Sequence, residues 1–167
     1  LAHCMRWIGQ AEKVLEMMVE RALGRELHGG VLADKQGIQR MISNSALELY
    51  QSKLMVLHAA YLLENKLPFR QEISMAKYHV ANTLWRILDR AIQVHGALGF
   101  SSDSPLGDMM RQARSARLVD GADEVPCRDL DVGDEAPADE CVHHPTDTWI
   151  LPEMAAYTTI PVVVIVN

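Results

Sequence analysis

Apolar residues recur at helical spacing through most of the first 120 positions of the chain. In residues 1–24, Met5, Ile8, Leu15, Met18 and Ala22 fall on one helical face, and charged residues occupy the other positions. This pattern predicts an amphipathic helix that ends near Gly24. The next segment, residues 28–30, contains two glycines and predicts a loop.

Two further stripes predict longer helices over residues 34–64 and 69–94. Asp34 stands where a side-chain cap is expected, and Pro68 separates the two helices because proline interrupts helical hydrogen bonding. The stripes consist of Ile38, Met41, Ile42, Leu49, Val56, Leu57 and Ala60 in the first helix, and Ile73, Ala76, Val80, Leu84, Ile87, Ala91 and Val94 in the second. Lys77, Arg86 and Arg90 fall outside the second stripe, so we expect them to be solvated. Each helix would be about 40 Å long, and the short break favours antiparallel packing.

Glycine and proline divide the segment that follows. Gly96 and Gly99 permit positive φ and a close approach of a ligand to the backbone. Ser104 and Pro105 predict the start of a fourth helix, with serine as cap and proline at the first helical position. Its buried face would contain Leu106, Met109, Met110 and Ala113. Four such helices predict an all-α, up-down four-helix bundle over residues 1–125.

The composition changes at Pro126. Residues 126–167 hold eight acidic residues, one base and five of the seven prolines. We therefore expect a second segment, a divergent, acidic, proline-rich tail that is irregular and poorly ordered. Within it, residues 160–166 have high β-propensity but no partner strand is evident.

Charge and hydropathy exclude several classes of protein. The net charge of −6 argues against nucleic acid as a partner. No apolar run reaches the roughly 18 residues that span a bilayer, so no membrane span is expected. The start lacks the features of a signal peptide, which argues against secretion. The chain begins with Leu1 rather than Met, as expected for a piece from inside a longer protein.

The cysteines do not predict a disulfide framework. Cys4, Cys127 and Cys141 are an odd set without a CxxC pair, which favours a reducing compartment over disulfides. Cys127, Cys141, His143 and His144 do not follow a known zinc spacing, so we expect no metal site.

Several short motifs occur in a specific order. They are Arg25-x-x-His-Gly-x-x-Leu32 with Gln36-x-Ile38, then Ala91-Ile-Gln-Val-His-Gly-Ala-Leu-Gly-Phe100, Pro105-Leu106, Arg111-x-Ala-Arg114 and Asp120-Gly-Ala-Asp-Glu124. Together they resemble the C-terminal domain of the acyl-CoA dehydrogenase family, flavoproteins that oxidise acyl-CoA thioesters. The resemblance covers about residues 1–125. It is nearest to the subgroup with Asp in place of the catalytic Glu.

The resemblance implies a four-helix bundle, acyl-CoA as substrate, an electron-transferring flavoprotein as partner, and a homo-oligomer. It also implies FAD as cofactor, and we expect FAD binding to need the family's other domains, which this stretch does not include. The implied reaction is α,β-dehydrogenation of acyl-CoA to 2-enoyl-CoA. The implied location is the bacterial cytoplasm or, in eukaryotes, mitochondria or peroxisomes. Since only one domain is covered, we expect this fragment of an enzyme to be inactive alone. The alternative is a non-catalytic helical module for oligomerisation or assembly.

Asp120 corresponds to the catalytic base of the family, and Gly121 to a backbone contact with substrate. A carboxylate in a dry, apolar site has a raised pKa and is a better base. Without the resemblance, an Asp-Gly pair at a helix end indicates only a turn.

Arg25 corresponds to the arginine that binds the FAD pyrophosphate, generally from a neighbouring subunit. Its guanidinium fork suits phosphate oxygens, although a helix-end arginine can also serve the helix dipole. Other positions implied to contact the cofactor are Glu26, Leu27, His28, Lys35, Gln36, Gln93, Val94, His95, Gly96, Ala97, Ala122, Asp123 and Glu124. His28 replaces a frequent aromatic, Ala97 a preferred glycine, and Ala122 a usual hydroxyl. His95 can also be a packed or solvated residue. We expect Asp120 and Arg25 to face one shared cavity, completed by other domains or a neighbouring subunit.

Overall fold

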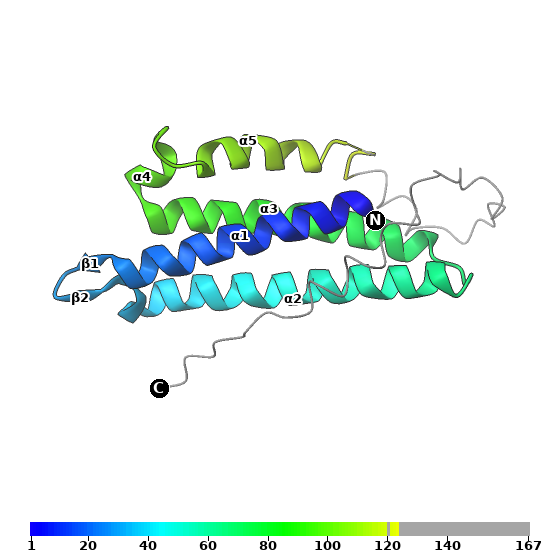
Figure 1. Cartoon of the computed structure of the whole chain (residues 1–167), viewed down its shortest axis with the longest axis horizontal. Coiled ribbons are helices and arrows are strands. Elements are labelled where there is room, and N and C mark those ends of the chain that lie inside the picture. Colours follow the sequence, from blue (N-terminus) through cyan, green and yellow to red (C-terminus); the bar gives the residue numbers. More distant parts are fainter. Residues whose placement is uncertain (120, 124–167) are drawn as a thin grey trace. The chain divides into compact units, whose positions relative to one another are not determined.

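The structure, a computed structural model, describes residues 1–119 and 121–123. Four long helices in this part run alternately in opposite directions (Figure 1). They are α1 (Ala2–Gly24), α2 (Gln36–Glu64), α3 (Arg70–His95) and α5 (Leu106–Ala116). The predicted all-α, up-down bundle is therefore confirmed for these residues. The predicted tail at residues 126–167 lies outside the described residues.

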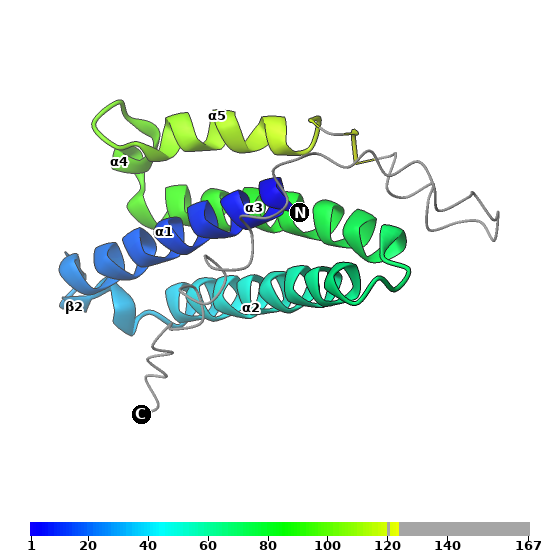
Figure 2. The same cartoon turned by 45° about the vertical axis from the view of Figure 1, so that its right-hand side comes forward.

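Helix α3 is the centre of the bundle, because it contacts α1, α2 and α5. Figures 1 and 2 both place α5 on the side of α3 opposite to α2. The fully buried side chains include Met18 of α1, Leu84, Ile87 and Leu88 of α3, and Leu106 of α5. Burying each such side chain stabilises the fold by about 1.5–3 kcal/mol. The predicted stripe of α2 is less deeply buried, and Leu57 is 41% exposed.

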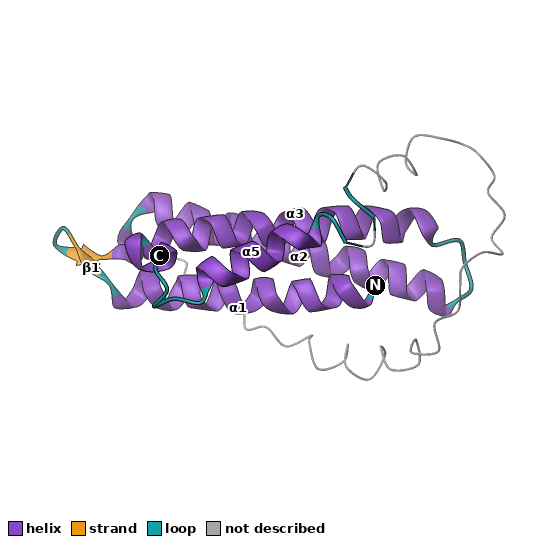
Figure 3. Cartoon of the chain, turned by 90° about the horizontal axis from the view of Figure 1, so that it is seen from above, coloured by secondary structure: helices purple, strands orange, loops and turns teal. Residues whose placement is uncertain are grey.

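A short β-hairpin, which the sequence did not predict, connects α1 to α2. Strands β1 (Glu26–Leu27) and β2 (Gly30–Val31) are antiparallel, with Glu26 opposite Val31. The two turn residues, His28 and Gly29, both have positive φ, at 49° and 76°. Positive φ at both central residues is typical of tight hairpin turns. Figure 3 shows the hairpin extending beyond one end of the helices.

The start of α2 differs from the prediction. Asp34 does not cap the helix, because it lies in the 3-10 turn η1 (Leu32–Asp34) and α2 begins at Gln36. Leu32 is buried, and the amide of Lys35 donates to its carbonyl at 3.1 Å. Anchoring Leu32 in the core therefore requires one extra turn before the helix can begin.

The glycines after α3 have different roles. Gly96 has φ 66° and ends the helix, as predicted. Gly99 does not have positive φ, because it lies inside the short helix α4 (Ala97–Phe100). A Cβ atom there would lie 2.8 Å from the carbonyl oxygen of Ile92. The close approach at Gly99 is therefore between α4 and the end of α3.

Helix α5 begins near the predicted position. The Ser104 hydroxyl accepts a hydrogen bond from the amide of Leu106 at 3.3 Å, and the helix begins at Leu106, just after Pro105. Leu106 and Ala113 are buried, and Met109 and Met110 pack partly buried against the core. Among the described residues, none of the helices combines the length and the apolar character that a membrane span requires.

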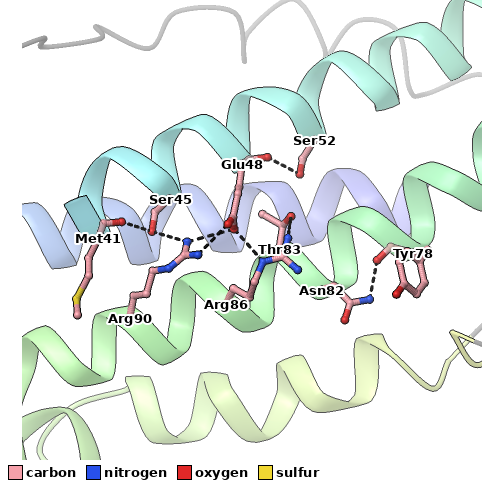
Figure 4. Close-up of polar contacts among 9 residues, drawn as sticks. All are labelled: Met41, Ser45, Glu48, Ser52, Tyr78, Asn82, Thr83, Arg86 and Arg90. Carbon is pink, nitrogen blue, oxygen red and sulfur yellow. Dashed lines mark hydrogen bonds and ion pairs between the residues drawn. The ribbon is translucent and has the colours of Figure 1, made fainter. Parts of the chain in front are cut away.

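Three basic side chains of α3 that we expected to be solvated are paired instead. Arg86 and Arg90 both donate to the carboxylate of Glu48 on α2 (Figure 4). Lys77 is 7% exposed and pairs with Asp123. The periodicity of α3 alone could not predict these pairs, because both acidic partners lie on other segments.

Candidate cofactor-binding pocket

One end of the bundle contains a pocket of about 320 Å³. The end of α1, the hairpin, the start of α2, the end of α3 and the start of α4 all contribute to it. Its lining residues are Arg21, Arg25, Leu27, Leu32, Ile38, Gln93, Val94, His95, Gly96, Ala97 and Leu98. The fold therefore brings together the two segments, around Arg25 and over residues 93–97, that the sequence singled out separately for cofactor binding.

Backbone hydrogen bonds fix the position of Arg25, while its side chain is exposed. It directly follows α1, with φ −103° and ψ 118°, and its amide donates to the carbonyl of Arg21 at 3.1 Å. Its own carbonyl accepts a hydrogen bond from the amide of Leu32 at 2.7 Å. Within the described residues no carboxylate forms an ion pair with Arg25. The guanidinium is thus available to a ligand.

The last turn of α3 forms the opposite wall. His95 Nδ1 lies 2.8 Å from the carbonyl oxygen of Ala91, so this nitrogen donates and fixes the ring. The space where a Cβ of Gly96 would stand is open. Gln93, Gly96 and Ala97 are exposed. This wall therefore offers an amide side chain and an uncovered stretch of backbone.

The polar lining of the pocket is suited to an anion. It contains two guanidinium groups, from Arg21 and Arg25, and no carboxylate. Leucine, isoleucine and valine side chains supply most of the apolar surface, and Gln93 and His95 add an amide and an imidazole. A pocket with an apolar wall and cationic groups fits a ligand that carries both phosphates and an apolar part. These residues are compatible with the adenosine diphosphate half of FAD.

Arg21 was not among the residues that we expected to contact the cofactor. Its Nε is buried and has no hydrogen-bond partner among the described residues. Its spacing could have identified it, because Arg21 precedes Arg25 by four residues and so lies one helical turn before it.

Other predicted cofactor residues lie outside this pocket. Glu26 and His28 are exposed on the hairpin, and Lys35 is half-buried before α2. Gln36 lines a second cavity of about 530 Å³ with Gly37, Gln39, Arg40 and Ser43. Their predicted roles stay predictions.

The segment after α5 is partly described. Asp120, the predicted base, and Glu124 lie outside the described residues. Gly121 has φ 91°, and Ala122 is half-buried. Cys127, Cys141, His143 and His144 also lie outside, and residues 1–119 and 121–123 contain no group of three or more His, Cys, Asp or Glu side chains that could hold a metal ion.

Asp123 is the centre of a buried charge cluster. Its carboxylate accepts hydrogen bonds from Arg117 Nε at 2.7 Å and Asn82 Nδ2 at 2.9 Å, and lies 3.5 Å from Lys77 Nζ. Burial raises the pKa of Asp123, but the hydrogen bonds and the positive charges lower it more, so its pKa lies below the ordinary range. Lys77 also donates to the carbonyl of Gly121. We call Asp123, Arg117, Asn82 and Lys77 the Asp123 cluster. It fixes the segment that follows α5 against α3.

The pocket and the Asp123 cluster lie at different levels of the bundle. Lys77 precedes Gln93 by 16 residues on the same helix, which corresponds to about 24 Å. In Figure 1 the yellow end of α5 lies at the opposite end of the bundle from α4. Gly121 and Asp123 therefore do not line the pocket of Arg25 within one copy of the chain. Asp120 itself lies outside the described residues, so the shared cavity of Asp120 and Arg25 stays a prediction.

Comparisons with known proteins match the helical bundle to acyl-CoA dehydrogenases. The family profile described as "Acyl-CoA dehydrogenase, C-terminal domain" matches residues 1–131. Acyl-CoA dehydrogenase family member 11 of Rattus norvegicus is 39% identical over 125 residues, which cover 74% of this chain and 16% of that protein. A solved structure from Mycobacterium abscessus, described as an acyl-CoA dehydrogenase, has a TM-score of 0.73 and 38% identity, over 75% of this chain and 31% of that one. Butyryl-CoA dehydrogenase from Megasphaera elsdenii gives a TM-score of 0.73 at 25% identity, over 75% of this chain and 33% of that one.

Proposed function

Since the chain belongs to the acyl-CoA dehydrogenase family of FAD-dependent flavoproteins and contains its C-terminal domain, we propose that it serves the α,β-dehydrogenation of an acyl-CoA thioester to a 2-enoyl-CoA. The chain spans only 16% of the rat relative and about a third of the two solved structures. The complete activity therefore requires parts that this chain does not contain. The observation that carries the proposal is the pocket that joins Arg25 to residues 93–97.

In this proposal the pocket binds the adenosine diphosphate half of FAD. Arg25 pairs with the pyrophosphate through its guanidinium fork. Gln93 and the open backbone at Gly96 contact the adenosine side. The apolar residues of the wall shield one side of the phosphates from water, which strengthens the charge pairing.

Asp120 is the proposed base. Its carboxylate takes the proton from C2 of the acyl group, the C3–H electron pair leaves as a hydride, and the C2–C3 double bond forms. When bound, FAD supplies the hydride acceptor. The Asp123 cluster supports this role, because Lys77 and Asn82 of α3 hold Gly121 and Asp123, which follow Asp120 in the sequence. Gly121 is the proposed backbone contact with substrate.

The separation of about 24 Å between the pocket and the Asp123 cluster supports a site built from two copies. One copy would supply Arg25 and residues 93–97, and the other would supply Asp120. We therefore propose a homo-oligomer, with an electron-transferring flavoprotein as the oxidant of the reduced cofactor. This bundle by itself does not close over the reacting carbons and the flavin ring, so the chain alone is expected to be inactive.

The test is FAD binding by the purified 167-residue chain, followed by flavin absorbance and by fluorescence quenching. The expected result is binding that weakens in Arg25→Gln and not in Arg6→Gln, an exposed arginine elsewhere on α1. Acyl-CoA with an artificial electron acceptor should give no turnover. Binding that is unchanged by Arg25→Gln would refute the assignment of the pocket.

The second candidate function is assembly alone, and one surface favours it. Leu47, Tyr50, Leu54, Leu57 and Tyr61 are 41–59% exposed on α2. Their spacing alternates between three and four residues, which is the heptad pattern of helices that pair with each other. A second copy is the proposed occupant, because an identical apolar stripe is self-complementary across a two-fold axis.

Sedimentation equilibrium and FAD binding together separate the two candidates. Leu54→Glu is expected to shift the chain toward monomer, whereas Leu23→Glu, which is 53% exposed on α1, should not. A chain that oligomerises through this stripe and does not bind FAD would support assembly alone. An oligomeric state insensitive to Leu54→Glu would exclude the stripe as the interface.

A further inference from the structure

Arg21 is a second arginine in the pocket, and it is not part of the family motif that begins at Arg25. It lies in the last turn of α1, one turn before Arg25, and lines the same pocket. The two residues are joined through the backbone, because the amide of Arg25 donates to the carbonyl of Arg21 at 3.1 Å. Any ligand that reaches Arg25 in this pocket is therefore close to Arg21.

The side chain of Arg21 is not fully satisfied within the described residues. Its Nε is buried and makes no hydrogen bond there. An unpaired buried donor is unfavourable, and a charged one more so. An acceptor supplied by a ligand would remove this cost. No carboxylate lines the pocket to do so.

A basic residue in the last turn of a helix can also act on the helix dipole alone. That role needs only a positive charge near the carbonyl end, and an exposed side chain fulfils it. It does not require Nε to be buried on the wall of a pocket. Burial of Nε beside a second, exposed arginine is the arrangement expected for two cations that share one dianionic group.

We propose that Arg21 is a further cofactor-binding residue, which donates to one phosphate of the pyrophosphate while Arg25 donates to the other. This rests on the proposed function, in that it assumes the pocket takes an adenosine diphosphate group. The planar guanidinium is needed, since Nε and a terminal nitrogen can bind two oxygens of one phosphate. A lysine at this position would retain the charge but not the fork.

The test is isothermal titration calorimetry of the 167-residue chain with ADP and with adenosine. Arg21→Gln is expected to weaken ADP binding by about tenfold to a hundredfold, the range for a lost charge-assisted hydrogen bond. It should leave adenosine binding unchanged. Arg21→Lys should restore only part of the loss, and Arg6→Gln on the exposed face of α1 should have no effect.

Two results would overturn the role of Arg21. One is unchanged ADP affinity in Arg21→Gln. The other is an equal loss for ADP and adenosine, which would indicate that Arg21 only supports the local structure. A circular dichroism melt of each variant verifies that the helices are intact, and Arg21→Lys provides the comparison if the glutamine variant does not fold.

The same titrations separate this inference from the proposed function. If Arg21→Gln weakens ADP binding and Arg25→Gln does not, the role of Arg21 holds and that of Arg25 fails. If the reverse occurs, only Arg21 fails. If 3′-phospho-ADP binds more tightly than ADP and depends equally on Arg21, the pyrophosphate assignment holds but coenzyme A is its source. A wild-type chain that binds neither nucleotide would refute both proposals.

Discussion

The guanidinium of Arg90 on α3 binds both carboxylate oxygens of Glu48 on α2, at 2.8 and 3.1 Å. Arg86 adds a third hydrogen bond to the same carboxylate at 3.0 Å. Ser45 also accepts from Arg90, at 3.2 Å (Figure 4). A bidentate arginine–carboxylate pair fixes geometry as well as charge. This pair therefore sets how α2 and α3 align along their length.

Replacing Glu48 by Gln is expected to lower the free energy of unfolding by about 1–2 kcal/mol. The substitution leaves two half-buried guanidinium groups with a weaker acceptor, and partial exposure reduces the cost below that of a fully buried pair. Urea denaturation measures the change. Glu64→Gln at the exposed end of α2 is the control and should have no measurable effect; equal stability of Glu48→Gln and the wild type would show that the network contributes little.

Stability should also depend on pH through Glu48. Burial raises the pKa of Glu48, but the hydrogen bonds and charges of Arg90 and Arg86 lower it more, to below the ordinary value of 4.5. A carboxyl with a depressed pKa contributes its full stability above the unfolded value, and this contribution is lost as the pH falls through the folded value. The unfolding free energies of the wild type and Glu48→Gln should therefore converge below pH 4.5. A difference that persists unchanged at acidic pH would contradict this.

Replacing Lys77 by Met should release the segment after α5 while leaving the bundle folded. Methionine keeps the apolar volume but removes the donor to Gly121 and the charge beside Asp123. Hydrogen exchange at the Asp123 amide, which donates to Arg117 at 3.1 Å, should become faster by an amount equivalent to about 1–3 kcal/mol. Lys13→Met, on the exposed face of α1, is the control. Unchanged protection at Asp123 would mean that Arg117 and Asn82 suffice to hold the segment.

Two glycines that differ in surroundings allow a matched comparison. A Cβ at Gly99 would lie 2.8 Å from the Ile92 carbonyl and 2.9 Å from His95 Cβ, whereas at Gly107 it would meet nothing within 4 Å. We expect Gly99→Ala to destabilise the chain by about 1–3 kcal/mol, because the end of α3 must move. Gly107→Ala in α5 should be neutral or stabilising by up to about 1 kcal/mol. Thermal melts of both variants test this, and equal effects would argue against the tight contact of α4 with α3.

The amino-acid sequence by itself determined the helices and their breaks. The periodicity of residues such as Leu84, Ile87 and Ala91 is a local property, and burial of that face requires helical packing whatever the partner. Pro68 and Gly96 act through their own backbone geometry, so the helix ends that they cause could also be predicted from the sequence. The family motifs around Arg25 and over residues 93–97 could be recognised from their order and spacing along the chain.

The tertiary structure alone decided which residues meet. Lys77, Arg86 and Arg90 were expected in solvent because their acidic partners, Asp123 and Glu48, are distant in sequence. The burial of Arg21 Nε depends on the wall that α3 and the hairpin form around it. The separation of the pocket from the Asp123 cluster follows from the length and direction of α3. A side chain's spacing gives its helical face, but its partners and its burial depend on segments that only folding brings near.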